Sequence, residues 1–127
     1  MQDQRQYLRF NIEGVVAITV KDAPERSVSC SLVDISFKGI GCVFNVATQE
    51  QLKENLAVRL ELTTPFREGA ICGEGVIRYV TPMQRRGQAM FRIGIEFGDI
   101  NAAAIQEILA RIQQQIRVQS RTTRIVQ

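Results

Sequence analysis

Two arginines near the start of the chain have the residue type and the spacing to hold an anion. Arg5 and Arg9 are four residues apart and precede the first long apolar run of the sequence. A guanidinium group offers a planar fork of donors, which meets a phosphate or the O6 and N7 edge of a guanine in bidentate fashion. Two such groups on one segment can clamp a small anionic ligand.

A second set of polar residues lies downstream, between two expected strands. Asp34, Ser36 and Gly39 occupy one short connection. The Asp34 carboxylate only accepts hydrogen bonds and suits the N–H donors of a guanine, whereas the Ser36 hydroxyl both donates and accepts. Gly39 permits a positive φ or a close backbone approach. Together with the arginines, these residues complement a ligand that contains phosphates and guanines.

Both motifs also have a purely structural interpretation. Asp-x-Ser-x-x-Gly between strands is typical of a turn in which the side chains bond nearby amides. Exposed arginines before a strand are usually solvated, and so are strand-face charges such as Lys38, Arg78 and Arg92, which we do not include in the site. Each motif alone favours the structural interpretation, and it is their co-occurrence in this order that favours a ligand site.

The elements that must position these residues are predominantly β. Six segments alternate apolar and polar residues or are rich in β-branched residues, which predicts short strands at regular spacing and hence a closed antiparallel barrel. Gly73 and Gly75 predict a bulge or bend within the fifth strand. The polar segment 48–56 predicts one or two turns of helix. The six expected strands are residues 12–20, 27–33, 40–44, 57–63, 70–80 and 89–97.

An amphipathic helix is expected after Phe97. Its apolar positions recur at helical spacing, and Asp99 or Asn101 can cap its first turn. We expect the apolar stripe to pack on the barrel, with a dimer seam as the alternative. The apolar stripe consists of Ile105, Ile108, Leu109, Ile112 and Ile116.

The expected organisation is a single mainly β domain over residues 1–127. A flexible ligand-clamping leader (1–11) precedes a six-stranded barrel (12–98). A helix (101–119) and a basic, non-periodic tail (120–127) follow the barrel.

Composition excludes several kinds of chemistry. The chain has no histidine, so neither Ser-His-Asp nor Cys-His catalysis nor a His-ligated metal site is possible. Its three cysteines (Cys30, Cys42, Cys72) match neither a disulfide framework nor a CxxC spacing. We interpret them as small buried thiols in a reducing compartment. With no apolar run long enough for a membrane span, the expected location is the cytoplasm.

The basic charge is concentrated at one end of the chain. There are 16 Lys and Arg against 13 Asp and Glu, and the residues from Ile108 onward hold four arginines and no acid. A general polyanion binder usually spreads basic charge over a face of the domain. Nucleic-acid binding is therefore expected to be unlikely. A barrel that binds single strands by stacking is disfavoured too, because six Phe, two Tyr and no Trp supply few surface aromatics.

The combination of motifs resembles the PilZ domain family of cyclic di-GMP receptors. The family pattern is RxxxR in an N-terminal leader followed by [D/N]xSxxG on the barrel, here Arg5 and Arg9, then Asp34, Ser36 and Gly39. Residues 92–97 (RIGIEF) look like the family's closing strand. The resemblance covers about residues 4 to 110, and the family's barrel agrees with the six strands and helix expected from the patterns.

The resemblance implies a function and a role for each residue. Arg5 and Arg9 would hold phosphates and guanine edges of cyclic di-GMP, Asp34 and Ser36 would read guanine, and Gly39 would allow close approach. The leader would fold over the ligand and change the surface offered to a protein partner. Beyond this ligand, neither a cofactor nor a metal is implied.

Some questions stay open at the level of sequence. Many members carry an arginine directly before RxxxR, where this chain has Gln4, so either one or two bound ligands are compatible with the sequence. The oligomeric state, monomer or homodimer, is a separate open question. The alternative function is a PilZ-like protein-interaction module that does not bind nucleotide. An enzyme is the weakest hypothesis, because Asp34 is the only carboxylate in the constellation.

Overall fold

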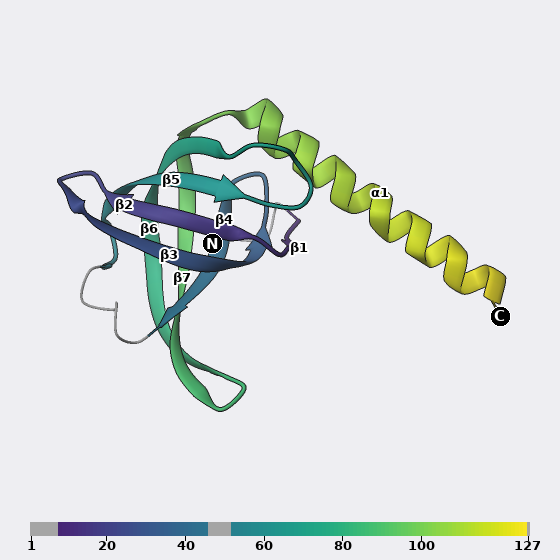
Figure 1. Cartoon of the computed structure of the whole chain (residues 1–127), viewed down its shortest axis with the longest axis horizontal. Helices are drawn as coiled ribbons and strands as arrows, with labels where there is room; N and C mark the ends of the chain where they lie inside the picture. Colours follow the sequence, from purple (N-terminus) through teal and green to yellow (C-terminus); the bar gives the residue numbers. More distant parts are fainter. Residues whose placement is uncertain (1–7, 46–51, 127) are drawn as a thin grey trace, which may run out of the picture.

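A computed structural model describes residues 8–45 and 52–126, with side chains described up to residue 119. Residues 1–7, which include Arg5, lie outside the described residues. In chain order, the elements are β1 (Phe10–Asn11), β2 (Val15–Val20), β3 (Ala23–Ile35), β4 (Gly39–Asn45), β5 (Ala57–Thr63), β6 (Ile71–Arg85), β7 (Gln88–Ile100) and α1 (Ala102–Val126) (Figure 1).

The strands form a closed antiparallel barrel. The order is β1-β3-β2-β5-β6-β7-β4, and β3 also pairs with β4, so the six strands β2–β7 close on themselves. The short β1 lies outside this ring and pairs only with β3 in the described structure. The predicted six-stranded barrel with a C-terminal helix is thus confirmed.

The interior follows directly from the alternation in the sequence. Strand β5 buries Val58, Leu60 and Leu62 and exposes the residues between them. Burying each of these side chains stabilises the fold by about 1.5–3 kcal/mol. A register slip of one residue would turn all three toward water, so the pattern fixes the pairing with β2 and β6.

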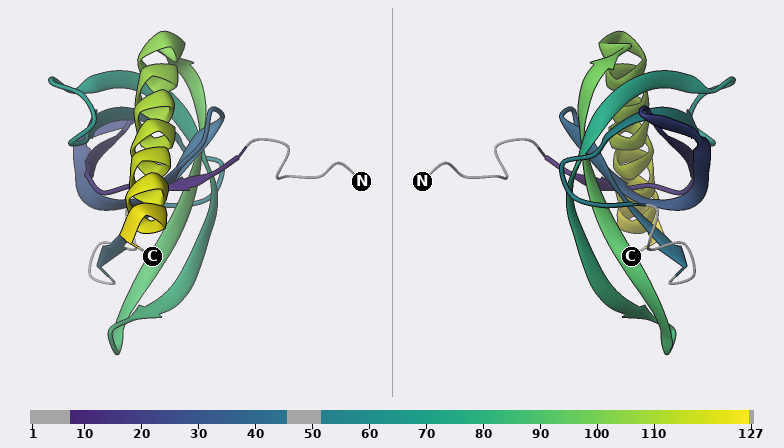
Figure 2. Two further views of the ribbon diagram at one scale, coloured as in Figure 1. Left: turned by 90° about the vertical axis from the view of Figure 1, so that its right-hand side faces the viewer. Right: turned by 90° about the vertical axis from the view of Figure 1, so that its left-hand side faces the viewer.

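Strands β6 and β7 are longer than the sequence predicts. They continue past the barrel as a two-stranded ribbon (Figures 1 and 2), which ends in a turn at Arg86 and Gly87. Pro82 lies inside this ribbon, beyond residue 80, where the fifth strand was expected to end. A proline is accommodated there because β5 pairs with β6 only as far as Val76, so no strand on that side needs an N–H from Pro82. A register shift between Gly73 and Gly75 confirms the expected bulge.

Three further expectations need correction. The first expected strand (12–20) is shorter in the structure, because β2 begins only at Val15, after Gly14 at a φ of 152°, and the separate β1 lies before residue 12. Part of the expected helical segment 48–56 lies outside the described residues. In its described part, Asn55 lies in a turn with a positive φ of 67°. The Asn55 N–H donates a hydrogen bond to the Ile77 carbonyl at 2.7 Å. Cys72 is exposed, because it falls on the outward phase of β6, whereas Cys30 and Cys42 are buried.

The first half of α1 packs on the barrel, as its apolar stripe predicts. Asn101 caps the helix, with its Oδ1 accepting a hydrogen bond from the Ala104 N–H at 3.1 Å. Ile105, Ile108 and Ile112 are buried in the common core, whereas Ile116 is half exposed.

The helix also continues further than expected. Residues 120–126 extend α1 rather than forming a non-periodic tail. Neither Gly nor Pro interrupts this stretch, and its two arginines are good helix formers. Within the described part of the chain, no helix has the combination of length and apolar character that crossing a bilayer requires.

Candidate ligand-binding site

The β1–β3 pairing brings the two motifs together. Asn11 lies opposite Asp34 in this register, so Arg9, just before β1, is close to the Asp34 side chain. The Arg9 guanidinium donates to Oδ1 of Asp34 from Nε at 3.1 Å and from Nη2 at 2.8 Å. The second arginine of one motif is therefore ion-paired with the aspartate of the other.

A second arginine, which we had expected to be solvated, completes the cluster. Arg92 on β7 donates from Nη2 to Oδ2 of Asp34, so each carboxylate oxygen has its own guanidinium partner. The Asp34 side chain is 13% exposed, against 41% for Arg9 and 30% for Arg92. Local sequence holds no signal for this contact, because 58 residues separate the partners and only the closed barrel brings them together.

Gly41 makes room for the pair. It lies opposite Asp34 on β3 and Gly94 on β7. A Cβ atom at this position would lie 2.7 Å from Oδ1 of Asp34 and 2.8 Å from Nη2 of Arg92. A glycine is required for Asp34 and Arg92 to meet across β4.

Tyr79 supports Arg92 from the other side. A register shift between Ile77 and Tyr79 places Tyr79 opposite Gly94, and its ring lies against that glycine. The Arg92 Nε donates to the Tyr79 hydroxyl at 3.4 Å. Partial burial alone would lower the pKa of Arg92, but the hydrogen bonds to Tyr79 and Asp34 and the Asp34 charge outweigh it and raise that pKa. Arg92 is therefore held as a cation.

Ser36 and Gly39 shape the connection between β3 and β4. The buried Ser36 Oγ accepts hydrogen bonds from the N–H groups of Lys38 (3.1 Å) and Gly39 (3.2 Å). A Cβ on Gly39 would collide with the carbonyl oxygen of Ile95 on β7. Both residues thus fix the turn that follows Asp34, and the Ser36 hydroxyl bonds backbone.

Arg78, which is also not included in the site, pairs with a carboxylate other than Asp34. Arg78 makes an exposed ion pair with Glu96 at 2.6 Å across β6 and β7. Within residues 8–45 and 52–126, no group of three or more Cys, Asp or Glu residues is arranged to hold a metal ion.

The cluster has the charge to receive an anion. Two guanidinium groups against one carboxylate leave it positive, and the sequence adds Arg5 four residues before Arg9. Arg9 is the more exposed arginine and stands beside a two-residue strand, whereas Arg92 lies within β7. An incoming anion can therefore recruit Arg9 without disturbing the barrel.

Comparison with known families agrees with this geometry. The family model for the PilZ domain matches residues 3–114, which include both motifs, all the strands and the anchored half of α1. This chain belongs to the PilZ domain family. The search of curated proteins found no match.

Solved PilZ structures share the fold at low sequence identity. The PilZ domain of Escherichia coli YcgR, solved with c-di-GMP, has a TM-score of 0.74 at 14% identity over 93% of this chain and 98% of its own. The K. pneumonia MrkH–c-di-GMP complex has a TM-score of 0.73 at 15% identity, covering 96% of this chain and 57% of that one. The Bacillus subtilis inhibitor of motility MotI/DgrA has a TM-score of 0.66 at 23% identity, covering 94% and 53%. This PilZ chain thus spans about half the length of MrkH and MotI.

Proposed function

We propose that this PilZ protein is a receptor for cyclic di-GMP and reports the bound state to a protein partner. The observation that carries the proposal is the Arg9–Asp34–Arg92 cluster, in which residues of both ligand motifs meet on the outside of the barrel. The family membership and the c-di-GMP complexes of YcgR and MrkH support the choice of ligand.

The chemistry of the cluster fits the two halves of this ligand. Cyclic di-GMP carries two phosphodiester charges, which suit Arg5 and Arg9, and two guanines, whose N–H donors suit the Asp34 carboxylate. Arg92 then keeps Asp34 oriented from within β7. Ser36 and Gly39 contribute by holding the turn after Asp34, so their effect on the ligand runs through backbone position.

Binding would exchange one ion pair for another. A partly exposed pair such as Arg9–Asp34 contributes only about 0–1 kcal/mol, so releasing Arg9 to a phosphate costs little. Charge-assisted bonds to phosphate are the stronger type. The leader that carries Arg5 and Arg9 then folds over the ligand, which changes the surface available to a partner.

Calorimetric titration with cyclic di-GMP tests the proposal, with GTP as a decoy ligand. We expect saturable binding that Arg9→Gln and Asp34→Asn abolish and that Arg59→Gln leaves unchanged, because Arg59 is an exposed arginine on β5, which does not pair with β1, β3 or β4. The stoichiometry of the titration shows whether one or two cyclic di-GMP molecules bind to a chain that carries Gln4 before the RxxxR motif.

If no heat of binding is detected at ligand concentrations of about 100 μM, the free energy of binding is weaker than about −5.5 kcal/mol. The PilZ-like interaction module would then replace the receptor as the proposed function.

A further inference from the structure

The second half of α1 extends away from the barrel without covering any other described element. Figure 1 shows this half of α1 projecting from the barrel. Burial in the core ends at Ile112, and residues 113–119 are all exposed. Residues 113–126, which we call the distal helix, extend about 21 Å at a rise of about 1.5 Å per residue. An isolated helix of this length is only marginally stable in water, so the distal helix depends on the anchored half that nucleates it.

The charge of the distal helix is entirely positive. Arg117, Arg121 and Arg124 follow one another at i, i+4 and i+7, positions that share one face of a helix, and no acid occurs after Glu107. In the anchored half, by contrast, Arg111 is ion-paired with Glu107 at 3.1 Å, and Glu107 also pairs with Arg67 at 3.5 Å. The helix dipole favours cations in the last turn, which accounts for Arg124 but not for Arg117 two turns earlier. Like charges at this spacing destabilise a helix, and an anionic partner would remove that cost.

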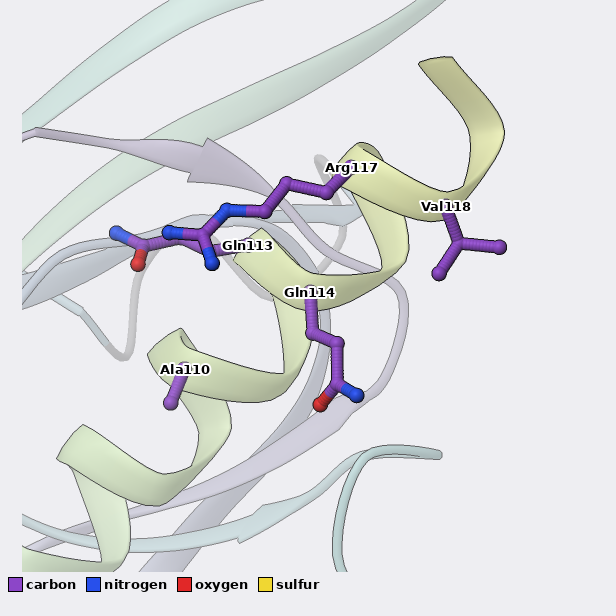
Figure 3. A pocket seen from close by; sticks show the side chains of 5 residues that line it. All are labelled: Ala110, Gln113, Gln114, Arg117 and Val118. Carbon is purple, nitrogen blue, oxygen red and sulfur yellow. The ribbon is translucent and has the colours of Figure 1, made fainter. Parts of the chain in front are cut away.

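The neighbouring side chains on this face are hydrogen-bonding amides. A shallow hollow on the helix is lined by Ala110, Gln113, Gln114, Arg117 and Val118, and Figure 3 shows Gln113 and Arg117 reaching to the same side from successive turns. Arg and Gln are side chains that contact phosphates and base edges in nucleic-acid complexes.

The described apolar side chains of the distal helix form no continuous apolar face. Within residues 113–119 these are Ile116 and Val118, each about half exposed. Positions two residues apart in a helix are separated by about 200°, so Ile116 and Val118 lie on different faces. The chain has no aromatic residue after Phe97. Protein interfaces rely on aromatic and apolar anchors, and membrane-surface helices on a continuous apolar face. The apolar stripe of α1 is already packed on the barrel as far as Ile112.

We propose that the distal helix is a docking surface for double-stranded nucleic acid. A duplex presents the dense, regular negative charge that a stripe of arginines complements, and its major groove is wide enough to admit an α-helix. On sequence alone we expected such binding to be unlikely, because the basic charge is concentrated at one end of the chain and is not spread over a face of the domain. The structure separates the arginines from the rest of the chain by placing them on an extending helix.

The test uses the full chain and a fluorescent duplex DNA of mixed sequence, with binding followed by anisotropy at several NaCl concentrations. If three arginines contact phosphates, a plot of the logarithm of the binding constant against the logarithm of the salt concentration should have a slope of about −3. Arg117→Gln/Arg121→Gln should weaken binding and reduce this slope by about two. Gln keeps the helix propensity of Arg, so circular dichroism should show unchanged helix content.

A matched control lies on the other extension of the molecule. Arg85→Gln/Arg86→Gln removes the same charge from the exposed tip of the β6–β7 ribbon and should leave the slope unchanged. If this variant lost as much DNA affinity and salt dependence as the helix variant, DNA would be binding to the overall positive charge of the protein. That result would overturn the assignment to the distal helix. Absence of DNA binding, or arginine-dependent binding to anionic phosphatidylglycerol vesicles without DNA binding, would also overturn it. None of these outcomes depends on cyclic di-GMP.

Discussion

Asp34 accepts hydrogen bonds from guanidinium groups that reach it from two different elements. Arg9 comes from the segment before β1 and is the more exposed, whereas Arg92 comes from β7 and is fixed further by Tyr79. The two arginines are therefore not equivalent. In the proposed function, Arg9 exchanges Asp34 for a ligand phosphate, whereas Arg92 maintains the position of the carboxylate.

At the residue scale, Gly41 and Gly39 should separate ligand binding from stability. In Gly41→Ala the new Cβ meets the flexible ends of Asp34 and Arg92. We expect cyclic di-GMP affinity to fall at least about tenfold, while the free energy of unfolding falls by about 1 kcal/mol. In Gly39→Ala the Cβ meets the Ile95 carbonyl, so the backbone must move and the loss of stability should be larger. Titration measures the affinity and urea unfolding measures the stability of each variant. Equal losses of stability in Gly41→Ala and Gly39→Ala would contradict the different roles assigned to these two glycines.

Ser36 provides a second test at the same scale. Its hydroxyl is buried and accepts from two N–H groups, so Ser36→Ala leaves these donors without that acceptor. Such a loss costs about 1–3 kcal/mol, measurable by urea unfolding. At temperatures where the variant is folded, cyclic di-GMP affinity should stay within about threefold of wild type. Complete loss of binding by a folded variant would instead show that the hydroxyl touches the ligand.

At the element scale, α1 has two halves with different roles. Ile108 is fully buried in the core, whereas Ile116 is half exposed on the same helix. Ile108→Ala should lower the free energy of unfolding by about 2–5 kcal/mol, as expected for a large-to-small change in a core. Ile116→Ala should change it by less than about 0.5 kcal/mol. A comparable loss in Ile116→Ala would mean that the distal helix is packed in solution, for example against a second copy of the chain.

The whole molecule encloses two of its three thiols. Cys30 and Cys42 lie inside the barrel and Cys72 lies outside. A side-chain hydrogen bond between the Cys42 thiol and Cys30, together with burial, raises the pKa of Cys42 well above its usual range. The buried Cys42 thiol therefore keeps its proton at pH values where the unfolded chain loses it.

This shift predicts a loss of stability at alkaline pH. The contribution of Cys42 is fully present below the unfolded thiol pKa of about 8.5 and declines above it, by up to about 1.4 kcal/mol per pH unit. Urea unfolding between neutral pH and about pH 10 should show a shallower decline in Cys42→Ala than in wild type. Cys72→Ala is the matched control, since this side chain is exposed, and it should follow the wild type. Identical declines in all three proteins would contradict the prediction.

Sequence by itself determined the barrel and much of the candidate site. Alternating residues such as Val58, Leu60 and Leu62 have only one arrangement that buries one face, and the helical spacing of Ile105, Ile108 and Ile112 anchors α1 in the same local way. The two motifs were identifiable because each is short and contiguous.

Only the tertiary structure brought Arg92 to Asp34, since that contact depends on the pairing of β4 with both β3 and β7 across 58 residues of chain. It likewise decided the length of the β6–β7 ribbon and the direction of the distal helix. These depend on where neighbouring elements stop, which no local pattern records.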